Sequence, residues 1–189
     1  MSETEYLEFE EKSEIRHEFV NGHVYAMAGA GVNHNVINGN ASASLNVQLF
    51  GKPCITMSSD MRVKVQSKKV SYRYPDTIVV CGEIQLTDDS PQTITNPIVI
   101  IEVLSPSTAI KDYNEKLAEY VQIDSLKEYI LISQYEPKIE VYSRDDAGNW
   151  IYTLMTGLDT HIKLKSIDCT LELARLYDKT DIITADDDY

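Results

Sequence analysis

The chain has 189 residues, of which 43% are hydrophobic and 25% are charged, and its formal net charge is −13. This length and composition predict one soluble globular domain over residues 1–189, with a frayed acidic tail from about residue 179. The acidic excess excludes a protein that coats nucleic acid unspecifically, because such contacts depend on Lys and Arg. No apolar run is long enough to span a membrane and the first residues lack a secretory signal, so we expect a cytoplasmic protein with no membrane partner.

The first elements expected along the chain are a helix, a hairpin and a second helix. Residues 3–12 predict a short acidic helix. Asn21-Gly22 separates two strand-like runs and predicts a β-hairpin over residues 17–27, because both central positions of such a turn need a positive φ. Apolar residues recur at helical spacing from Asn33 to Phe50, which predicts an amphipathic helix.

The middle of the chain has the pattern of strands. Residues 54–57, 61–65 and 72–80 are the first strand candidates. Thr77–Val80 and Ile98–Val103 are continuously apolar, which is typical of neighbouring strands buried on both faces and covered by helices. The polar link over residues 82–96 is expected to be a surface loop that acts as a flap.

The last third predicts a helix, a strand meander and a terminal helix. Ser105-Pro106 ends the preceding strand, and Ser107 or Thr108 is expected to cap a helix over residues 109–122. Strands are expected over residues 128–133, 138–143 and 150–155, and a short helix over residues 171–177. The fold class is therefore α/β, with a mixed central β-sheet flanked by helices and an N-terminal helix and hairpin.

Two further patterns concern cysteine and basic residues. Cys54, Cys81 and Cys169 are odd in number and lie in apolar surroundings, which predicts buried thiols without a metal or redox role. Residues 52–73 hold six Lys or Arg residues against Asp60 alone, so a basic segment runs into the Pro75-Asp76 step. The alternative interpretation of that segment is a solvated hairpin. Asp60 and Arg62 are also expected to pair with each other on one strand face.

One carboxylate lies in each of the two apolar strands. A charge in such a strand is tolerated mainly when it is paired, hydrogen-bonded or holding a cation. If the strands are neighbours, Asp76 and Glu102 converge on one sheet end, where carboxylates suit a hard divalent cation such as Mg²⁺ or Mn²⁺. A metal held there polarises a phosphoryl oxygen and activates a water for phosphodiester cleavage.

Such a site also needs a cation that stabilises developing negative charge. Lys116 lies in the helix that follows the Glu102 strand and can reach back over the strand end, whereas the alternative is a surface ion pair with Asp112, four residues before it. Glu18 is a secondary candidate as a metal ligand or water-orienting base; the alternative is that it is a solvated strand carboxylate. His34 is another secondary candidate, and its alternative role is a helix cap or a partly exposed contact. Tyr120 is expected in the core.

These residues resemble one known family. The resemblance is carried by Glu18-Phe19-Val20-Asn21-Gly22, the helix of His34, Ser59-Asp60-Met61-Arg62, Tyr74-Pro75-Asp76, Glu102-Val103-Leu104-Ser105-Pro106-Ser107-Thr108 and Lys116-Leu117-Ala118-Glu119-Tyr120. Together they look like the Uma-type family of endonucleases, a branch of the PD-(D/E)xK nuclease superfamily, over residues 4–178. The resemblance implies a restriction-endonuclease-like core with a divalent-metal site.

Carried over by position, the resemblance implies that Asp76 and Glu102 are the two acidic residues of the superfamily signature, with the Val103 carbonyl as a third metal ligand. The signature places a Lys where this chain has Leu104, so Lys116 is the candidate for the displaced group. Two hypotheses follow. The first is a Mg²⁺- or Mn²⁺-dependent endonuclease that hydrolyses DNA as a homodimer, because cutting both strands needs two sites. The second is a catalytically inactive module of the same fold that binds nucleic acid or a protein.

Overall fold

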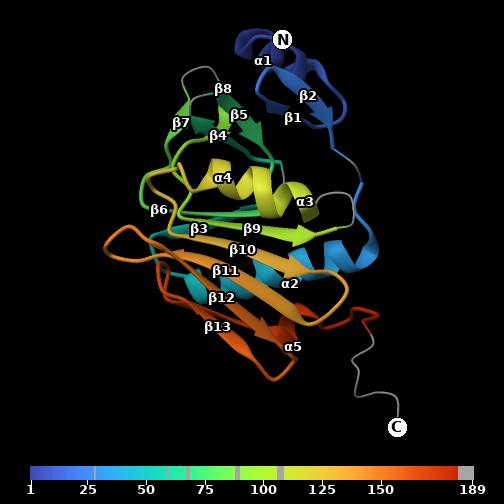
Figure 1. Ribbon diagram of the computed structural model, residues 1–189, viewed down its shortest axis with the longest axis vertical. Coiled ribbons are helices and arrows are strands. Elements are labelled where there is room, and N and C mark those ends of the chain that lie inside the picture. Colours follow the sequence, from blue (N-terminus) through green and yellow to red (C-terminus); the bar gives the residue numbers. More distant parts are fainter. Residues whose placement is uncertain (28, 59, 67–68, 88–89, 106–108, 183–189) are drawn as a thin grey trace.

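A computed structural model describes residues 1–27, 29–58, 60–66, 69–87, 90–105 and 109–182 (Figure 1). The helices are α1 (Glu3–Lys12), α2 (Val32–Leu49), α3 (Ala109–Lys111), the π-helical turn η1 (Asp112–Lys116), α4 (Leu117–Tyr120) and α5 (Leu173–Leu176). The strands are β1 (His17–Val20), β2 (His23–Ala26), β3 (Cys54–Ser58), β4 (Arg62–Gln66), β5 (Val70–Arg73), β6 (Thr77–Cys81), β7 (Leu86–Thr87), β8 (Ser90–Ile94), β9 (Val99–Leu104), β10 (Glu128–Ser133), β11 (Lys138–Arg144), β12 (Trp150–Thr156), β13 (His161–Leu164) and β14 (Cys169–Glu172). None of the helices in these ranges is long and apolar enough to cross a membrane.

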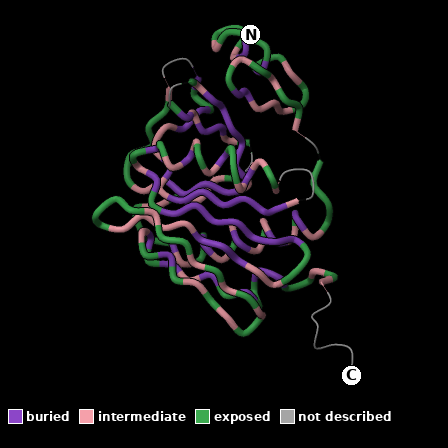
Figure 2. Tube along the Cα trace, in the orientation of Figure 1, coloured by how far each residue is buried: buried purple, intermediate pink, exposed green. Residues whose placement is uncertain are grey.

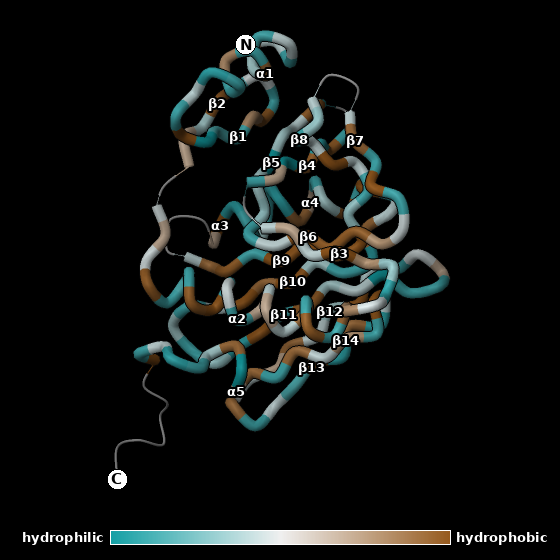
Figure 3. The backbone as a smooth tube through the Cα atoms, turned by 180° about the vertical axis from the view of Figure 1, so that it is seen from behind, coloured by the Kyte–Doolittle hydropathy of each residue, from teal (hydrophilic) through white to brown (hydrophobic). Residues whose placement is uncertain are grey.

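The centre of the molecule is a six-stranded mixed sheet in the order β12-β11-β10-β9-β6-β3. Strands β9 and β10 are parallel, and the other neighbours are antiparallel. Strands β6, β9 and β10 lie in the buried layer that crosses the middle of Figure 2, and their near-continuous apolar character gives the hydrophobic band in Figure 3. The predicted α/β fold with a mixed central sheet flanked by helices is confirmed.

The two faces of this sheet carry separate cores, because successive side chains of a strand point to opposite faces. Val99, Ile101 and Val103 of β9 pack with α2, the β13–β14 hairpin and α5. Ile100 and Leu104 pack on the other face, with α4 and with the apolar residues of β4 and β8. Glu102 lies between Ile100 and Leu104 on the same face of β9, so its carboxylate lies on the face covered by η1 and α4.

A second sheet lies above α4, in the order β2-β1-β5-β4-β8-β7 (Figure 1). It corrects two predictions. Residues 72–80 are not one strand: the chain leaves β5 before Pro75 and enters the central sheet as β6. Pro75 has no N–H to donate to a ladder, which suits the crossing between sheets. Residues 82–96 are not a plain loop either, because β7 and β8 form a hairpin and β8 pairs in parallel with β4.

The predicted N-terminal helix and hairpin are both present. Helix α1 begins with a capping box between Ser2 and Glu5. Its Tyr6 ring stacks on Phe19 of β1, with centroids 4.9 Å apart, and both pack against Tyr72 of β5. This aromatic cluster anchors the hairpin to the rest of the second sheet.

The hairpin turn depends on glycine at its second position. Asn21 has φ 53° and Gly22 has φ 90°, and L side chains rarely adopt the latter conformation. We expect Gly22→Ala to lower the free energy of unfolding by about 1 kcal/mol in urea titrations. Gly39→Ala is the matched control, because Gly39 lies inside α2 with open space around it. That variant should be up to about 1 kcal/mol more stable than the parent, since Ala has the higher helix propensity; a loss of equal size in both variants would contradict the assignment.

The cysteine prediction is wrong for two of the three residues. Cys54 and Cys81 face each other across β3 and β6 and form a disulfide, whereas Cys169 is a buried free thiol as expected. Near the C-terminus, residues 169–172 form β14 against β13, so the expected helix is shortened to α5. The three meander strands β10, β11 and β12 are confirmed. The expected cap residues Ser107 and Thr108 and the tail from residue 183 lie outside the described residues.

Candidate active site

The two strand carboxylates meet at one end of the central sheet. Antiparallel pairing of β6 and β9 sets Thr77 opposite Ile101. Asp76 and Glu102 are the next residues outward on each strand and therefore converge, as predicted. Asp76 Oδ2 accepts a hydrogen bond of 2.7 Å from the backbone N–H of Val103, which ties the two strand ends together.

Helix α2 holds the Asp76 segment from one side. His34 Nε2 lies 3.1 Å from Asp76 Oδ2, and Asn38 Nδ2 donates to the Asp76 carbonyl at 3.2 Å. Burial disfavours the charged imidazole, but the Asp76 carboxylate outweighs it and raises the pKa of His34. His34 is thus a buried partner of Asp76, which places it in the site and not in the alternative role of a helix cap.

Glu102 lies at the base of the site, with only 5% of its side chain exposed. Its Oε1 accepts hydrogen bonds from Lys116 Nζ at 2.8 Å and from the Tyr120 hydroxyl at 3.1 Å. Burial raises the pKa of Glu102 to about 8 against the attraction of Lys116, and the carboxylates of Asp112 and Asp76 act in the same direction as burial. Tyr120 is in the core as predicted, but its hydroxyl also fixes the Glu102 carboxylate.

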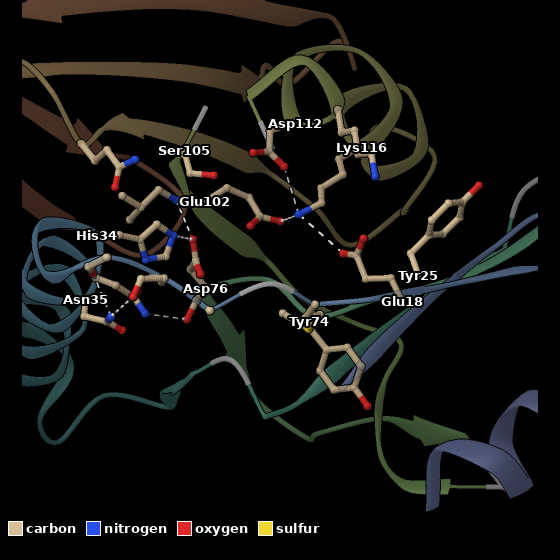
Figure 4. A pocket seen from close by; sticks show the side chains of 18 of the residues that line it. Glu18, Tyr25, His34, Asn35, Tyr74, Asp76, Glu102, Ser105, Asp112 and Lys116 are labelled. Atoms are coloured by element: carbon tan, nitrogen blue, oxygen red, sulfur yellow. Dashed lines mark hydrogen bonds and ion pairs between the residues drawn. The ribbon is translucent and has the colours of Figure 1, made fainter. Parts of the chain in front are cut away.

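Lys116 reaches the site from the π-helical turn, as the displaced-lysine hypothesis requires. Its ammonium lies 2.8 Å from Glu102, 3.0 Å from Asp112 and 3.6 Å from Glu18, and Figure 4 shows it directed between these carboxylates. Burial disfavours the charge, but the three carboxylates hold the pKa of Lys116 well above its usual range. The extra residue in a π-turn rotates the side chains that follow it, and such turns are frequent at functional sites.

Leu104 occupies the position on β9 where the superfamily signature has its lysine. Period-two alternation puts Leu104 on the same face as Glu102, so a lysine there would reach the same site. The Leu104 side chain is instead 6% exposed and packs in the apolar cluster with Tyr120 and Tyr129. Position 104 therefore contributes to core packing, and the positive charge of the site comes from Lys116 on the helical turn η1.

Glu18 is not a solvated strand carboxylate. Its Oε2 accepts a hydrogen bond of 2.9 Å from Arg73 Nη1, while its Oε1 faces Lys116. Arg73 is 1% exposed and also makes two hydrogen bonds to Glu119, of 2.8 and 3.0 Å. Burial opposes ionisation of Glu18, but Lys116 and Arg73 together lower its pKa. Arg73 does not line the cleft but holds Glu18, and the sequence interpretation missed this role; its place two residues before Pro75-Asp76 was the available signal.

The described part of the basic segment over residues 52–73 is not a fully solvated hairpin. Arg73 and Arg62 are both buried, and Lys64 pairs with Glu3 at 2.6 Å. The expected pair between Asp60 and Arg62 is absent: Asp60 lies 3.6 Å from Arg16, and Arg62 donates to Ser90 at 2.6 Å. Arg62, Lys64 and Arg73 therefore serve as partners within the molecule. Lys52 instead lies at the surface, 3.9 Å from Asp168.

All of the predicted site residues line one cleft of about 590 Å³. They are Glu18, His34, Asp76, Glu102, Val103 and Lys116. Asp112 adds a fourth carboxylate, whereas Lys111 is the one further Lys or Arg among the lining residues. Without a bound cation the cleft is therefore acidic, which opposes entry of a phosphodiester.

The residues at the sheet end fit a hard divalent cation. Among the described residues, no hydrogen bond reaches Asp76 Oδ1 or Glu102 Oε2, which leaves one oxygen of each carboxylate for a metal. No three His, Cys, Asp or Glu side chains in the described ranges are arranged to hold a metal. Mg²⁺ requires fewer, because it is usually bound through one or two carboxylates and keeps several waters. Asp76 and Glu102 supply the two carboxylates of such a set, and Val103 lines the same cleft.

Comparison with known proteins gives a consistent family and fold. The Uma2 family profile, described as “Putative restriction endonuclease”, matches residues 3–174. Two uncharacterized proteins of Synechocystis sp. (strain ATCC 27184 / PCC 6803 / Kazusa) are similar over most of their length. The protein sll1609 is 36% identical over 163 residues, which cover 86% of this chain and 92% of that protein. The protein slr1290 is 33% identical over 177 residues, which cover 94% and 91%.

A solved structure shares the fold. The crystal structure of “a putative nuclease belonging to DUF820” from Anabaena variabilis ATCC 29413 superposes with a TM-score of 0.71 and covers 87% of this chain and 91% of that one. Its sequence identity of 16% limits the likeness to the fold. The resemblance predicted from the motifs agrees with the family match.

Proposed function

Because the chain belongs to the Uma2 family of restriction-endonuclease-like proteins, we propose that it is a divalent-metal-dependent endonuclease that hydrolyses phosphodiester bonds in DNA. The observation that carries this proposal is the convergence of Asp76 and Glu102 at one sheet end, with the Lys116 ammonium 2.8 Å from Glu102. Oxygen ligands, a buried cation and a cleft are the parts that phosphodiester hydrolysis requires.

In the proposed mechanism, Asp76, Glu102 and the Val103 carbonyl would hold Mg²⁺ or Mn²⁺. When bound, the metal supplies Lewis-acid polarisation of a phosphoryl oxygen and a water of lowered pKa. His34 and the Val103 N–H fix the orientation of Asp76. Lys116 presents positive charge where negative charge develops on the phosphate.

Glu18 and Asp112 act through Lys116 in this proposal. They lie 3.6 and 3.0 Å from its ammonium and keep it protonated and directed at the site. Glu18 is thus assigned as a positioning residue, in place of the metal-ligand or base role that the sequence allowed. We also propose a homodimer, because each subunit then cuts one strand of a duplex.

Plasmid cleavage tests the proposal. With Mg²⁺ or Mn²⁺, the full chain should nick or linearise supercoiled DNA, and a chelator or Asp76→Ala should lower the rate at least about 100-fold. Asp159→Ala is a matched control, because Asp159 is an exposed carboxylate outside the cleft and the variant should cleave normally. Equal nicking by the parent and Asp76→Ala, or none by either, would contradict an active nuclease.

Metal titration separates the two hypotheses. Calorimetry should show a saturable Mn²⁺ site in the parent that Glu102→Gln removes. If that site is absent while DNA still binds with a salt-sensitive affinity, the buried Leu104 indicates a module that kept the fold without turnover.

A further inference from the structure

The mouth of the cleft carries a lysine that the proposed mechanism does not use. Lys111 ends α3, lines the cleft, and makes no ion pair with any carboxylate of the described residues. Lys116, by contrast, is held by three carboxylates. Because DNA affinity depends on phosphate neutralisation, Lys111 is the lining cation that remains available to a phosphate.

An aromatic ring lies beside this lysine. Lys111 Nζ is 4.9 Å from the centroid of the Tyr25 ring, across the cleft mouth from α3 to β2. The Tyr25 side chain belongs to the cleft because its register partner in the hairpin is Glu18, and directly opposite residues point to the same face. Figure 4 shows Tyr25 above Glu18, on the side of the site away from His34.

Tyr25 is also the lining aromatic with free surface. It is 45% exposed, whereas the other lining aromatic of the described cleft, Tyr74, is 2% exposed and donates its hydroxyl to Glu10. The Lys111 ammonium lies over one face of this half-exposed ring and pairs with no carboxylate of the described residues, so ring and lysine match the two parts of a nucleotide. Aromatic rings stack on bases, and lysines contact the phosphates of the same strand.

We propose that Tyr25 and Lys111 form a nucleotide-binding subsite at the cleft mouth, in which Tyr25 stacks on a base and Lys111 binds a phosphate of the same strand. This inference rests on the proposed nuclease function and specifies its substrate class. A base inside a duplex already stacks on both neighbours, so only an unpaired or flipped base offers its face to Tyr25. The preferred substrate is single-stranded DNA, or a duplex with unpaired nucleotides beside the scissile phosphate.

A fluorescent reporter tests the stacking. Trp150 is the sole tryptophan of the chain and lies on β12, so Trp150→Phe combined with Tyr25→Trp leaves one indole at the cleft mouth. Added Asp76→Asn prevents turnover. A 12-nucleotide oligo-dT should quench the emission, whereas a closed hairpin duplex without unpaired ends should leave it unchanged. Equal quenching by both DNAs overturns the inference.

Affinity measurements test the two residues separately by anisotropy of a labelled oligo-dT. Tyr25→Ala should weaken binding about 5- to 150-fold, the effect of losing one stacked base, whereas Tyr25→Phe should bind like the parent. Lys111→Gln should reduce the slope of log affinity against log salt by about 0.7. Lys127→Gln is the control, since Lys127 is exposed and precedes β10 at the opposite end of the sheet; its slope should not change.

The outcomes separate this inference from the proposed function. If plasmid cleavage depends on Asp76 but Tyr25→Ala binds and cleaves like the parent, the subsite is wrong and the nuclease stands. If oligo-dT quenches the indole but no DNA is cleaved with any metal, the subsite stands and the nuclease is wrong. Failure of any DNA to bind the parent overturns the subsite directly.

Discussion

Lys116→Met is expected to lower the free energy of unfolding by about 3–5 kcal/mol, because it leaves a cluster of buried carboxylates without their cation. The ammonium lies within 3.6 Å of Glu102, Asp112 and Glu18, and Asp112 has only 1% of its side chain exposed. Where the variant remains folded, DNA cleavage should fall about 10²- to 10³-fold, since the positive charge next to the phosphate is lost. Urea unfolding and plasmid cleavage measure the two effects.

A double substitution distinguishes charge from packing in this cluster. Glu102→Gln combined with Lys116→Met removes both members of the closest pair, so part of the stability lost in Lys116→Met should return. Lys116→Arg keeps the charge and should be less destabilised than Lys116→Met. If the double variant is as unstable as the sum of the two single variants, the ion pair does not account for the loss.

Arg73→Met should be the second large perturbation, with a loss of about 3–5 kcal/mol on the same physical grounds. The guanidinium holds Glu119 through two hydrogen bonds and Glu18 through a third, while its own side chain is 1% exposed. Without it, Glu18 loses the contact that orients it toward Lys116. Cleavage by Arg73→Met should therefore decline as well, with a larger change in kcat than in KM, because Arg73 lies behind the cleft wall and does not line it.

A surface ion pair of equal length provides the control for Arg73. Arg175 lies 2.8 Å from Glu172, the same distance as Arg73 from Glu119, but its side chain is 71% exposed. Arg175→Met should change the free energy of unfolding by less than about 1 kcal/mol and leave cleavage intact. Comparable losses in the two arginine variants would show that burial of the Arg73 network has no special effect.

The sequence predicted correctly those elements that depend on residues close together along the chain. Asn21-Gly22 specified a hairpin because its two residues need positive φ, and the apolar runs around Val79 and Ile100 specified adjacent buried strands. The same logic predicted that Asp76 and Glu102 converge. These inferences needed only backbone sterics, strand period and burial.

What the sequence did not predict depends on partners that are distant along the chain. Arg73 stood in a run of basic residues, and its burial is explained only by Glu18 and Glu119, at separations of 55 and 46 residues. The Cys54–Cys81 disulfide similarly requires β3 to lie against β6, which the cysteine spacing does not reveal. The β7–β8 hairpin forms in a polar segment because β4 offers it an edge. The π-turn at Asp112–Lys116 has no local signature either.

The origin of Lys116 on a helix has a consequence for how members of this family are recognised. When the acidic residue and the lysine lie two residues apart on one strand, the strand backbone fixes the distance between their side chains. Here Glu102 belongs to β9 and Lys116 to η1, so the docking of the helix on the strand end sets the distance between the two side chains. A search for a fixed interval between the acidic residue and the lysine will overlook chains of this kind. A search for a helical lysine that returns to the acid-bearing strand end will find them.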